Sequence, residues 1–120
     1  MTRQEIIDFC LTLPSAYEDY PFDRIKDGTE WAVMRHRANR KTFALVYERQ
    51  GKLCVNLKCD PFEADFLRSV YKDLIPGYHM NKTHWNTVFV GGDVPDKELQ
   101  NRTLRNYDLI KPKVRRGNRK

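Results

Sequence analysis

The sequence contains few residues of the kinds that build disulfide frameworks or metal sites. Its 120 residues include three cysteines, Cys10, Cys54 and Cys59, and three histidines. An odd number of cysteines without a CxxC pair fits neither a small disulfide-stapled domain nor a zinc ribbon. We therefore expect free thiols, a cytoplasmic protein and no bound metal.

Long apolar runs are also missing. No stretch approaches the roughly 18 apolar residues of a membrane-spanning helix, and the first residues form no apolar signal region, so we expect no membrane association. Hydrophobic residues make up 40% of the chain and charged residues 32%. This composition is typical of a soluble globular protein, and the length fits a single core.

Recognisable catalytic motifs are scarce. There is no GxSxG sequence, and Gly91-Gly92 is the one glycine pair, which is too little for a phosphate-binding loop. His79 and His84 are five residues apart, whereas the histidines of a helical HExxH zinc site are four apart. We expect neither enzymatic activity nor a cofactor. An enzyme built on His79 and His84 is a less favoured alternative, and it requires that the two rings converge.

The net charge of +6 is concentrated at the C-terminus. Residues 111–120, KPKVRRGNRK, hold six of the 22 Lys and Arg residues and no acid, so residues 1–110 hold 16 basic and 16 acidic residues. A segment of this composition cannot bury itself and is expected to be disordered. We therefore predict one domain over residues 1–110 and a basic tail over residues 111–120. The tail could add affinity for phosphates or serve solubility alone.

Three helices are predicted. The first begins at the capping box of Thr2 and Glu5 and ends before Pro14. The second begins at Asp60, with a proline at its first helical position. Its apolar residues recur at helical intervals and are Phe62, Phe66, Leu67, Val70 and Tyr71. The third is predicted over VPDKELQNRTLRNYDLI, with Pro95 in its first turn, and the residues expected to face inward are Leu99, Thr103, Leu104 and Tyr107.

Alternating polar and apolar residues predict the strands. The runs EWAVMRH, KTFALVYE and KLCVNLK are separated by the turn-like sequences RANR and RQGK, which indicates an antiparallel meander with two hairpins. A further strand is predicted at HWNTVFV, and residues 22–25 could add a short one. The expected fold class is therefore α+β, with an antiparallel sheet of four to five strands packed with three helices.

The tip of the first predicted hairpin, RHRANRK, is strongly basic. Its Lys and Arg residues, with no acid among them, are Arg35, Arg37, Arg40 and Lys41. Such a projection can contact phosphates, and Asn39 at the tip could read adenine in a DNA groove. The second tip adds Arg49 and Lys52. The alternative is that these side chains are only solvated and protect the hairpins from edge pairing.

The segment PGYHMNKTHWNT, residues 76–87, concentrates polar and aromatic side chains. His79, Asn81 and Lys82 offer hydrogen-bond donors and positive charge beside flat rings, a combination that suits phosphates and stacked bases. The structural alternative is equally open. Trp85 can belong to the core, and Asn81 can stabilise the turn through its own backbone.

Three blocks of the sequence occur in order: KCDPFEADFLR, then PGYHMNKTHWNTV, then VPDKEL followed by YDLI. In these blocks, and from the opening helix to about residue 110, the chain resembles the MmcQ/YjbR family of small bacterial proteins. The resemblance implies a YjbR-like α+β fold and DNA binding through a double wing of two hairpin-like projections, with no established catalytic activity or cofactor. The residues that match the central block are Tyr78, His79, Met80, Asn81, Lys82, Trp85 and Asn86.

We therefore expect a monomeric, non-enzymatic DNA-binding protein. In this hypothesis the basic hairpin tips and the loop of residues 76–87, which are far apart in sequence, act together on DNA. The alternative is a protein-interaction or adaptor module with no nucleic-acid role, because the neutral body lacks the broad basic face of most DNA-binding proteins. That alternative predicts an exposed apolar patch, for example from Tyr17, Tyr20 and Phe22.

Overall fold

A computed structural model describes residues 1–21, 31–78 and 80–113. The helices in these residues are α1 (Arg3–Leu11), α2 (Pro61–Val70) and α3 (Asp96–Ile110). The strands are β1 (Ala16–Asp19), β2 (Ala32–His36), β3 (Thr42–Arg49), β4 (Lys52–Lys58), β5 (Leu74–Pro76) and β6 (Trp85–Phe89). No helix in this part of the chain is long and apolar enough to cross a membrane. The possible strand at residues 22–25 lies outside the described residues.

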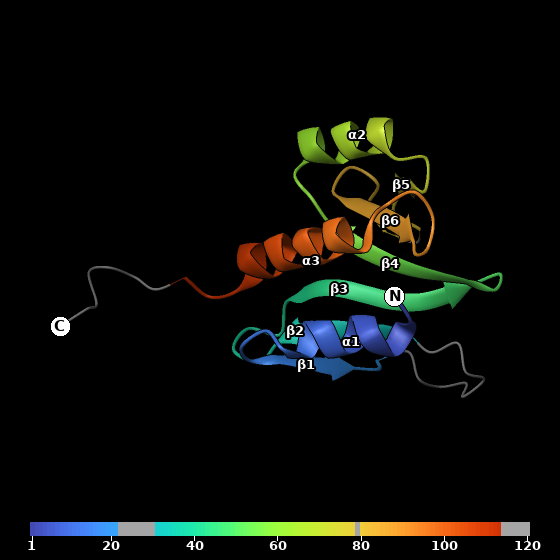
Figure 1. Cartoon of the computed structure of the whole chain (residues 1–120). Coiled ribbons are helices and arrows are strands. Elements are labelled where there is room, and N and C mark those ends of the chain that lie inside the picture. The colour runs from blue at the N-terminus through green and yellow to red at the C-terminus, as the bar shows by residue number, and fades with distance from the viewer. Residues whose placement is uncertain (22–30, 79, 114–120) are drawn as a thin grey trace.

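The strands form one antiparallel sheet in the order β1-β2-β3-β4-β6-β5 (Figure 1). Strands β2, β3 and β4 make the meander expected from the sequence, and the α+β fold class is confirmed. The described residues supply six strands rather than four to five, because β1 and β5 are only four and three residues long. Segments this short contain too few alternations to be told from turns by sequence.

Alternate residues of the central strands face opposite sides of the sheet. The hydrophobic core includes Ala44 and Val46 of β3, whereas the residue between them, Leu45, is buried outside that core cluster. All three helices contribute to the same cluster, through Ile6, Ile7, Cys10, Ala64, Leu67, Leu99, Tyr107 and Ile110. The described helices therefore cover one face of the sheet, on which α1 and α3 run side by side (Figure 1). We call the opposite side the helix-free face.

The ends and faces of the helices follow local sequence rules in part. Thr2 and Glu5 form the predicted capping box of α1. In α3, the prediction that Leu104 faces inward is wrong, because that side chain is 40% exposed. Asn106 is buried instead, and its amide donates a hydrogen bond to the carbonyl of Phe43. This hydrogen bond satisfies only one end of the amide, because among the described residues the Asn106 side-chain oxygen is buried without a hydrogen-bond partner.

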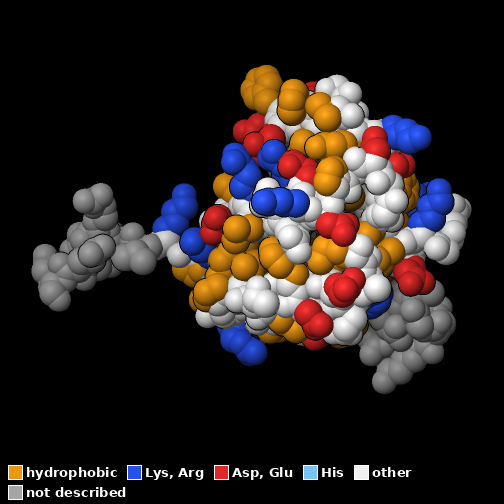
Figure 2. Space-filling view, viewed as in Figure 1, with side chains coloured by type: hydrophobic (Ala, Val, Ile, Leu, Met, Phe, Trp, Pro, Cys, Tyr) orange, Lys and Arg blue, Asp and Glu red, His pale blue; other side chains and the backbone are white. Residues whose placement is uncertain are grey.

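The apolar repeat of α2 divides into an inner and an outer stripe. Ala64 and Leu67 are buried, whereas Phe62, Phe66 and Val70 are 88%, 63% and 50% exposed. Figure 2 shows this side of the molecule, with hydrophobic side chains gathered over α2 and acidic and basic side chains interspersed below it. The apolar surface of α2 is thus wider than the part that packs on the rest of the domain.

Aromatic rings and a polar network cover part of the helix-free face. Trp31 stacks on Tyr47 with ring centroids 3.8 Å apart, and Tyr78 lies beside both rings. The side-chain oxygen of Asn56 accepts hydrogen bonds from the hydroxyls of Tyr47 (2.7 Å) and Thr87 (2.6 Å). The Asn56 amide donates to the carbonyl of Tyr78 (3.1 Å). Because an unsatisfied buried polar group costs roughly 1–3 kcal/mol, this network fixes where the chain after β5 lies.

Candidate nucleic-acid interface

The β2–β3 hairpin places the predicted basic tip at one end of the sheet and holds it against the body. The N–H of Arg37 donates to the carbonyl of Ser15 (2.8 Å), and the side-chain amide of Asn39 donates to the carbonyl of Ile110 at the end of α3 (2.8 Å). The Asn39 oxygen accepts the N–H of Lys41 (3.0 Å). The expectation that Asn39 reads adenine therefore loses its basis, because its amide is already used within the protein.

Arg35 is the most constrained of the four predicted basic residues. It forms an ion pair with Asp19 (2.9 Å) and donates to the carbonyl of Arg40 (3.0 Å) and the hydroxyl of Thr42 (3.2 Å). The other three side chains are exposed and are Arg37, Arg40 and Lys41. Arg37 lies over the ring of Tyr17, 5.4 Å from its centroid. Arg35 thus organises the tip, and the other three remain accessible to a ligand.

Two neighbouring surface hollows of about 540 and 460 Å³ share Arg35 and Arg40 in their linings. The first is also lined by Tyr17, Asp19 and Arg37. The second is also lined by Lys41, Thr42, Lys58, Trp85, Leu109 and Ile110. We call the two hollows together the basic groove.

The strand register explains why these residues meet. Tyr17 lies opposite Arg35, and Arg35 lies opposite Thr42. Farther along the sheet, Lys58 at the end of β4 lies opposite Trp85 at the start of β6. The groove therefore crosses five neighbouring strands, and at ~4.8 Å between strands its two aromatic residues are roughly 19 Å apart.

The charge of the basic groove is strongly one-sided. Among the described residues that line it, five are Lys or Arg and one is a carboxylate, Asp19. Because Asp19 is paired with Arg35, about four positive charges are left for a ligand. The arrangement provides a cationic track with an aromatic ring at each end, which suits a polyanion that also carries flat groups.

The loop between β5 and β6 is held mainly by its own polar groups. The Tyr78 N–H donates to the hydroxyl of Thr87 (2.8 Å), and the Lys82 ammonium donates to the carbonyl of Gly77 (3.2 Å). Gly77 is packed so closely that a Cβ there would lie 2.7 Å from the Cβ of Trp85. Of this loop, Trp85 reaches the basic groove.

Two further predicted residues of the loop, Asn81 and Lys82, do not line the groove. Asn81 and Lys82 are exposed, and the side-chain oxygen of Asn81 accepts the N–H of Thr83 (2.9 Å), so this asparagine stabilises its own turn. His79 lies outside the described residues. The hypothesis that His79 and His84 converge in a catalytic site therefore stays a prediction.

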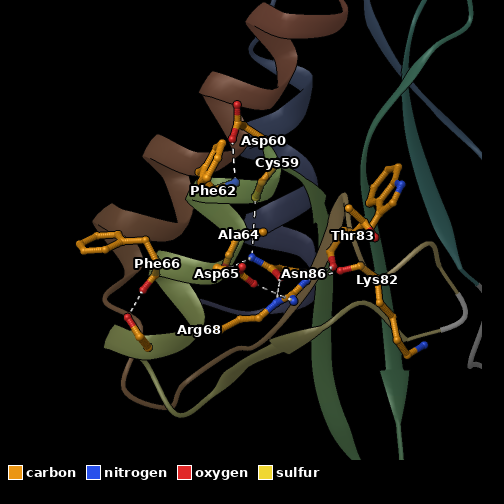
Figure 3. A network of polar contacts seen from close by, with 12 residues as sticks. Cys59, Asp60, Phe62, Ala64, Asp65, Phe66, Arg68, Lys82, Thr83 and Asn86 are labelled. Atoms are coloured by element: carbon orange, nitrogen blue, oxygen red, sulfur yellow. Dashed lines mark hydrogen bonds and ion pairs between the residues drawn. The ribbon is translucent and has the colours of Figure 1, made fainter.

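Arg68 of α2 fastens the end of this loop to the helical side (Figure 3). Its guanidinium donates to the side-chain oxygen of Asn86 (2.6 Å), to the carbonyl of Trp85 (3.2 Å) and to the carbonyl of Lys82. Asn86 is 1% exposed and donates in turn to the carbonyl of Ala64 (3.5 Å). Asn86 thus joins α2 to β6 and is inaccessible to a ligand.

The second hairpin tip is remote from the basic groove. Arg49 and Lys52 flank the turn at the other end of β3, and eight residues of strand separate the two tips by roughly 25 Å. The Arg49 guanidinium lies 3.8 Å from the ring centroid of Tyr78, and the Lys52 ammonium lies 5.4 Å from that of Phe89. The structure does not bring Arg49 and Lys52 into the groove.

Sequence reasoning did not select Tyr17 or Lys58 for this role, and it left Trp85 open between a stacking ring and a core residue. Tyr17 lies in a turn-rich segment, and Lys58 is a single lysine at the end of a strand. Nothing local distinguishes Tyr17 and Lys58 from ordinary surface residues. They are selected only by the register of β1, β4 and β6.

Metal and thiol chemistry receive no support from the described part of the chain. It contains no group of three or more His, Cys, Asp or Glu residues that could hold a metal ion. Cys10, Cys54 and Cys59 are free and buried. Burial raises the pKa of the Cys10 thiol to about 12 and also raises the pKa of Cys54 and of Cys59. Buried thiols of this kind are poor nucleophiles.

The described helices cover one face of an antiparallel sheet, and the basic groove lies at one end of the sheet, beside the end of α3. The fold is that of a small α+β protein. Comparison with protein families shows which family of this fold the chain is similar to: the YjbR family model matches residues 11–109. The chain belongs to the YjbR family.

Named relatives and solved structures agree with this assignment. The uncharacterized protein YjbR of Escherichia coli K12 is 31% identical over 99 residues, which are 82% of this chain and 78% of the relative. The uncharacterized protein YyaQ of Bacillus subtilis is 28% identical over 92% of this chain and 99% of its own length. A Pseudomonas syringae crystal structure matches with a TM-score of 0.79 and 29% identity over 92% of this chain and all of that chain. A Deinococcus radiodurans protein with a DUF419 domain matches with a TM-score of 0.78 and 32% identity, over 91% and 78% of the two chains.

Proposed function

We propose that the protein binds DNA through the basic groove and acts in the cytoplasm as a non-enzymatic monomer. The observation that carries the proposal is the row of cations at one end of the sheet, where one carboxylate accompanies five Lys or Arg residues. Phosphate contacts supply most of the affinity of proteins for DNA, and they require such a cluster of cations. The overall neutrality of residues 1–110 is compatible with the proposal because the charges are segregated.

The basic tail begins beside this surface. The chain leaves α3 at Ile110, which lines the basic groove. The six Lys and Arg residues of the segment 111–120 therefore follow directly from the rim of the groove. Each additional cation that reaches a phosphate steepens the salt dependence of binding.

The experiment is a fluorescence-anisotropy titration of labelled DNA at several salt concentrations from about 50 to 200 mM. The test variant, Arg37→Gln with Arg40→Gln, removes two groove charges. The matched control, Lys72→Gln with Lys97→Gln, removes two exposed charges that do not line the groove. We expect the test variant to lower the slope of log K against log salt by about 1.4–1.8, and the control to leave it nearly unchanged.

Two results would count against the proposal. One is no detectable binding by the full chain at about 50 mM salt. The other is equal weakening by the test and control variants, which would mean that binding follows net charge and not the groove. A chain that ends at Lys111 separates the tail from the groove, because its remaining affinity must still depend on Arg37 and Arg40.

A second candidate function, protein interaction, is favoured by α2. The patch expected from Tyr17, Tyr20 and Phe22 does not carry it: Tyr17 and Tyr20 are half-buried, and Phe22 lies outside the described residues. The exposed stripe on α2 is instead formed by Phe62, Phe66 and Val70. Residues at i, i+4 and i+8 on an exposed helix are the pattern by which a helix docks against a partner protein.

A nuclease-treated pull-down tests this second function. We expect the unmodified chain to retain a protein partner and the variant Phe62→Ser with Phe66→Ser to lose it. Because both rings are exposed, we expect these substitutions to change the stability of the domain little. Equal retention by both proteins would exclude this stripe as the interaction surface.

A further inference from the structure

We infer that the basic groove takes a single-stranded stretch of nucleic acid, with one base stacked on Trp85 and another on Tyr17. This inference rests on the proposed function and names the form of nucleic acid that the site takes. Its basis is the position of the two rings relative to the cations between them, and the way in which the hairpin tip is fixed.

The two rings lie at opposite ends of the cationic row. Both Tyr17 and Trp85 are half-buried, and the Arg37 guanidinium lies over the Tyr17 ring, so a base stacks on Tyr17 where Arg37 leaves the ring accessible. Between them lie Arg35 and Lys58, with the exposed tip residues Arg37, Arg40 and Lys41 along the rim. A strand that crosses the sheet can therefore place phosphates on the cations and bases on the terminal rings. The distance of roughly 19 Å between Tyr17 and Trp85 can be spanned by a few nucleotides of a single strand.

A double helix does not use this arrangement well. Its bases show only their edges in the grooves, because their faces are covered by neighbouring base pairs. An aromatic ring can stack only on a base whose face is exposed, as in a single strand. In a complex with duplex DNA, the cations of the groove would contact phosphates, but the two rings would have no exposed base face on which to stack.

The hairpin tip is a wall of the groove and not a free ribbon. Its backbone is tied to Ser15, and its Asn39 amide is tied to the end of α3 at Ile110. His36 is 8% exposed, and its Nδ1 accepts the N–H of Ala38 (3.0 Å). A ribbon that enters a DNA groove must project its tip and its polar side chains. Here these contacts direct the tip toward the body, which favours a ligand lying along the groove.

The test compares three labelled probes on the full chain: oligo-dT and oligo-U of about 12 nucleotides, and a DNA duplex of the same length. Anisotropy is measured at about 50 mM salt for the unmodified protein, for Trp85→Leu and for Trp85→Phe. We expect at least one single strand to bind more tightly than the duplex. Trp85→Leu should weaken single-strand binding by about 5- to 150-fold, Trp85→Phe should restore most of it, and neither should change duplex binding appreciably.

The variant Tyr17→Leu provides a second test at the other end of the groove, and thermal unfolding confirms that each variant is folded. Duplex binding as tight as single-strand binding would overturn the inference. So would an unchanged affinity of Trp85→Leu and Tyr17→Leu for both single strands while Arg37→Gln with Arg40→Gln weakens them. That second result would leave the proposed function intact. Absence of binding to all three probes would refute the proposed function itself.

Discussion

The contact between Arg68 and the β5–β6 loop yields a quantitative prediction for the substitution Arg68→Met. This change keeps much of the side-chain volume and removes the donors to Asn86, Trp85 and Lys82. The Lys82 carbonyl is exposed and can be rehydrated, and the Trp85 carbonyl still accepts the N–H of Gly77 (2.8 Å). The side-chain oxygen of Asn86 cannot be rehydrated, because that residue is 1% exposed.

The magnitude follows from the buried group. An unsatisfied buried acceptor costs about 1–3 kcal/mol, and the loss of hydrogen bonds from a charged donor raises the total toward the upper end. We expect a loss of about 2–3 kcal/mol in the free energy of unfolding. For a domain of this size, that corresponds to a fall in Tm of roughly 10 °C. Binding to the groove should weaken as well, because Trp85 lies in the segment that Arg68 holds.

Urea and thermal unfolding measure the effect, with Asp65→Asn as the matched control. Asp65 forms a 3.5 Å ion pair with the same Arg68, but its side chain is 83% exposed. Its loss should cost less than about 0.5 kcal/mol. A double-mutant cycle between Arg68→Met and Asn86→Ala should give a coupling of about 1 kcal/mol or more. The reasoning fails if Arg68→Met is no worse than the control, or if the cycle shows no coupling.

Three further predictions concern buried protons and one turn. Burial raises the pKa of Tyr47 and of Cys10 to about 12. The folded chain therefore keeps these protons longer than the unfolded chain, and stability should fall as the pH rises from about 9 toward 12. Urea unfolding across this pH range should show that the free energy of unfolding falls less steeply with pH for Tyr47→Phe than for the unmodified chain. An identical pH dependence of the two proteins would contradict the raised pKa of Tyr47. Cys10 should react with a thiol reagent far more slowly in the folded chain than in urea, and fast reaction of the native protein would show that it is accessible. In the β3–β4 turn, Gln50 and Gly51 have φ of 53° and 76°, so Gln50→Asn should raise stability by about 0.5 kcal/mol and Gly51→Ala should lower it, as measured by urea unfolding. If Gln50→Asn lowered the stability and Gly51→Ala raised it, backbone strain at these two positions would be excluded as the cause of the stability changes.

Much of the fold can be predicted from local sequence rules. The capping box at Thr2, the proline after Asp60 and the strand-like composition of β3 and β4 each act over a few neighbouring residues, and the structure confirms the helix ends and the two strands. The alternation predicted for β3 is not complete, because Phe43 and Ala44 both belong to the core. The short strands β1 and β5 are not predictable in the same way, because their pairing partners and not their own composition decide their conformation. The inward position given to Leu104 fails for a related reason: which side of a helix is buried depends on what packs there.

The features of the basic groove can likewise be divided into those that the sequence predicts and those that depend on the tertiary structure. The sequence by itself determined the charge of the hairpin tip and the meander of β2, β3 and β4, since both depend on residues close together in the chain. The position of the tip and of the β5–β6 loop also depends on distant residues, namely Ser15, Ile110 and Arg68. Only the tertiary structure decided that Tyr17, Lys58 and Trp85 belong beside Arg37 and Arg40. It also placed Arg49 and Lys52 at the far end of the same strand and enclosed Asn86 beneath α2. The physical reason is that strand register joins residues far apart in the chain, and no local pattern of charge or hydrophobicity encodes which residues will share a row across a sheet.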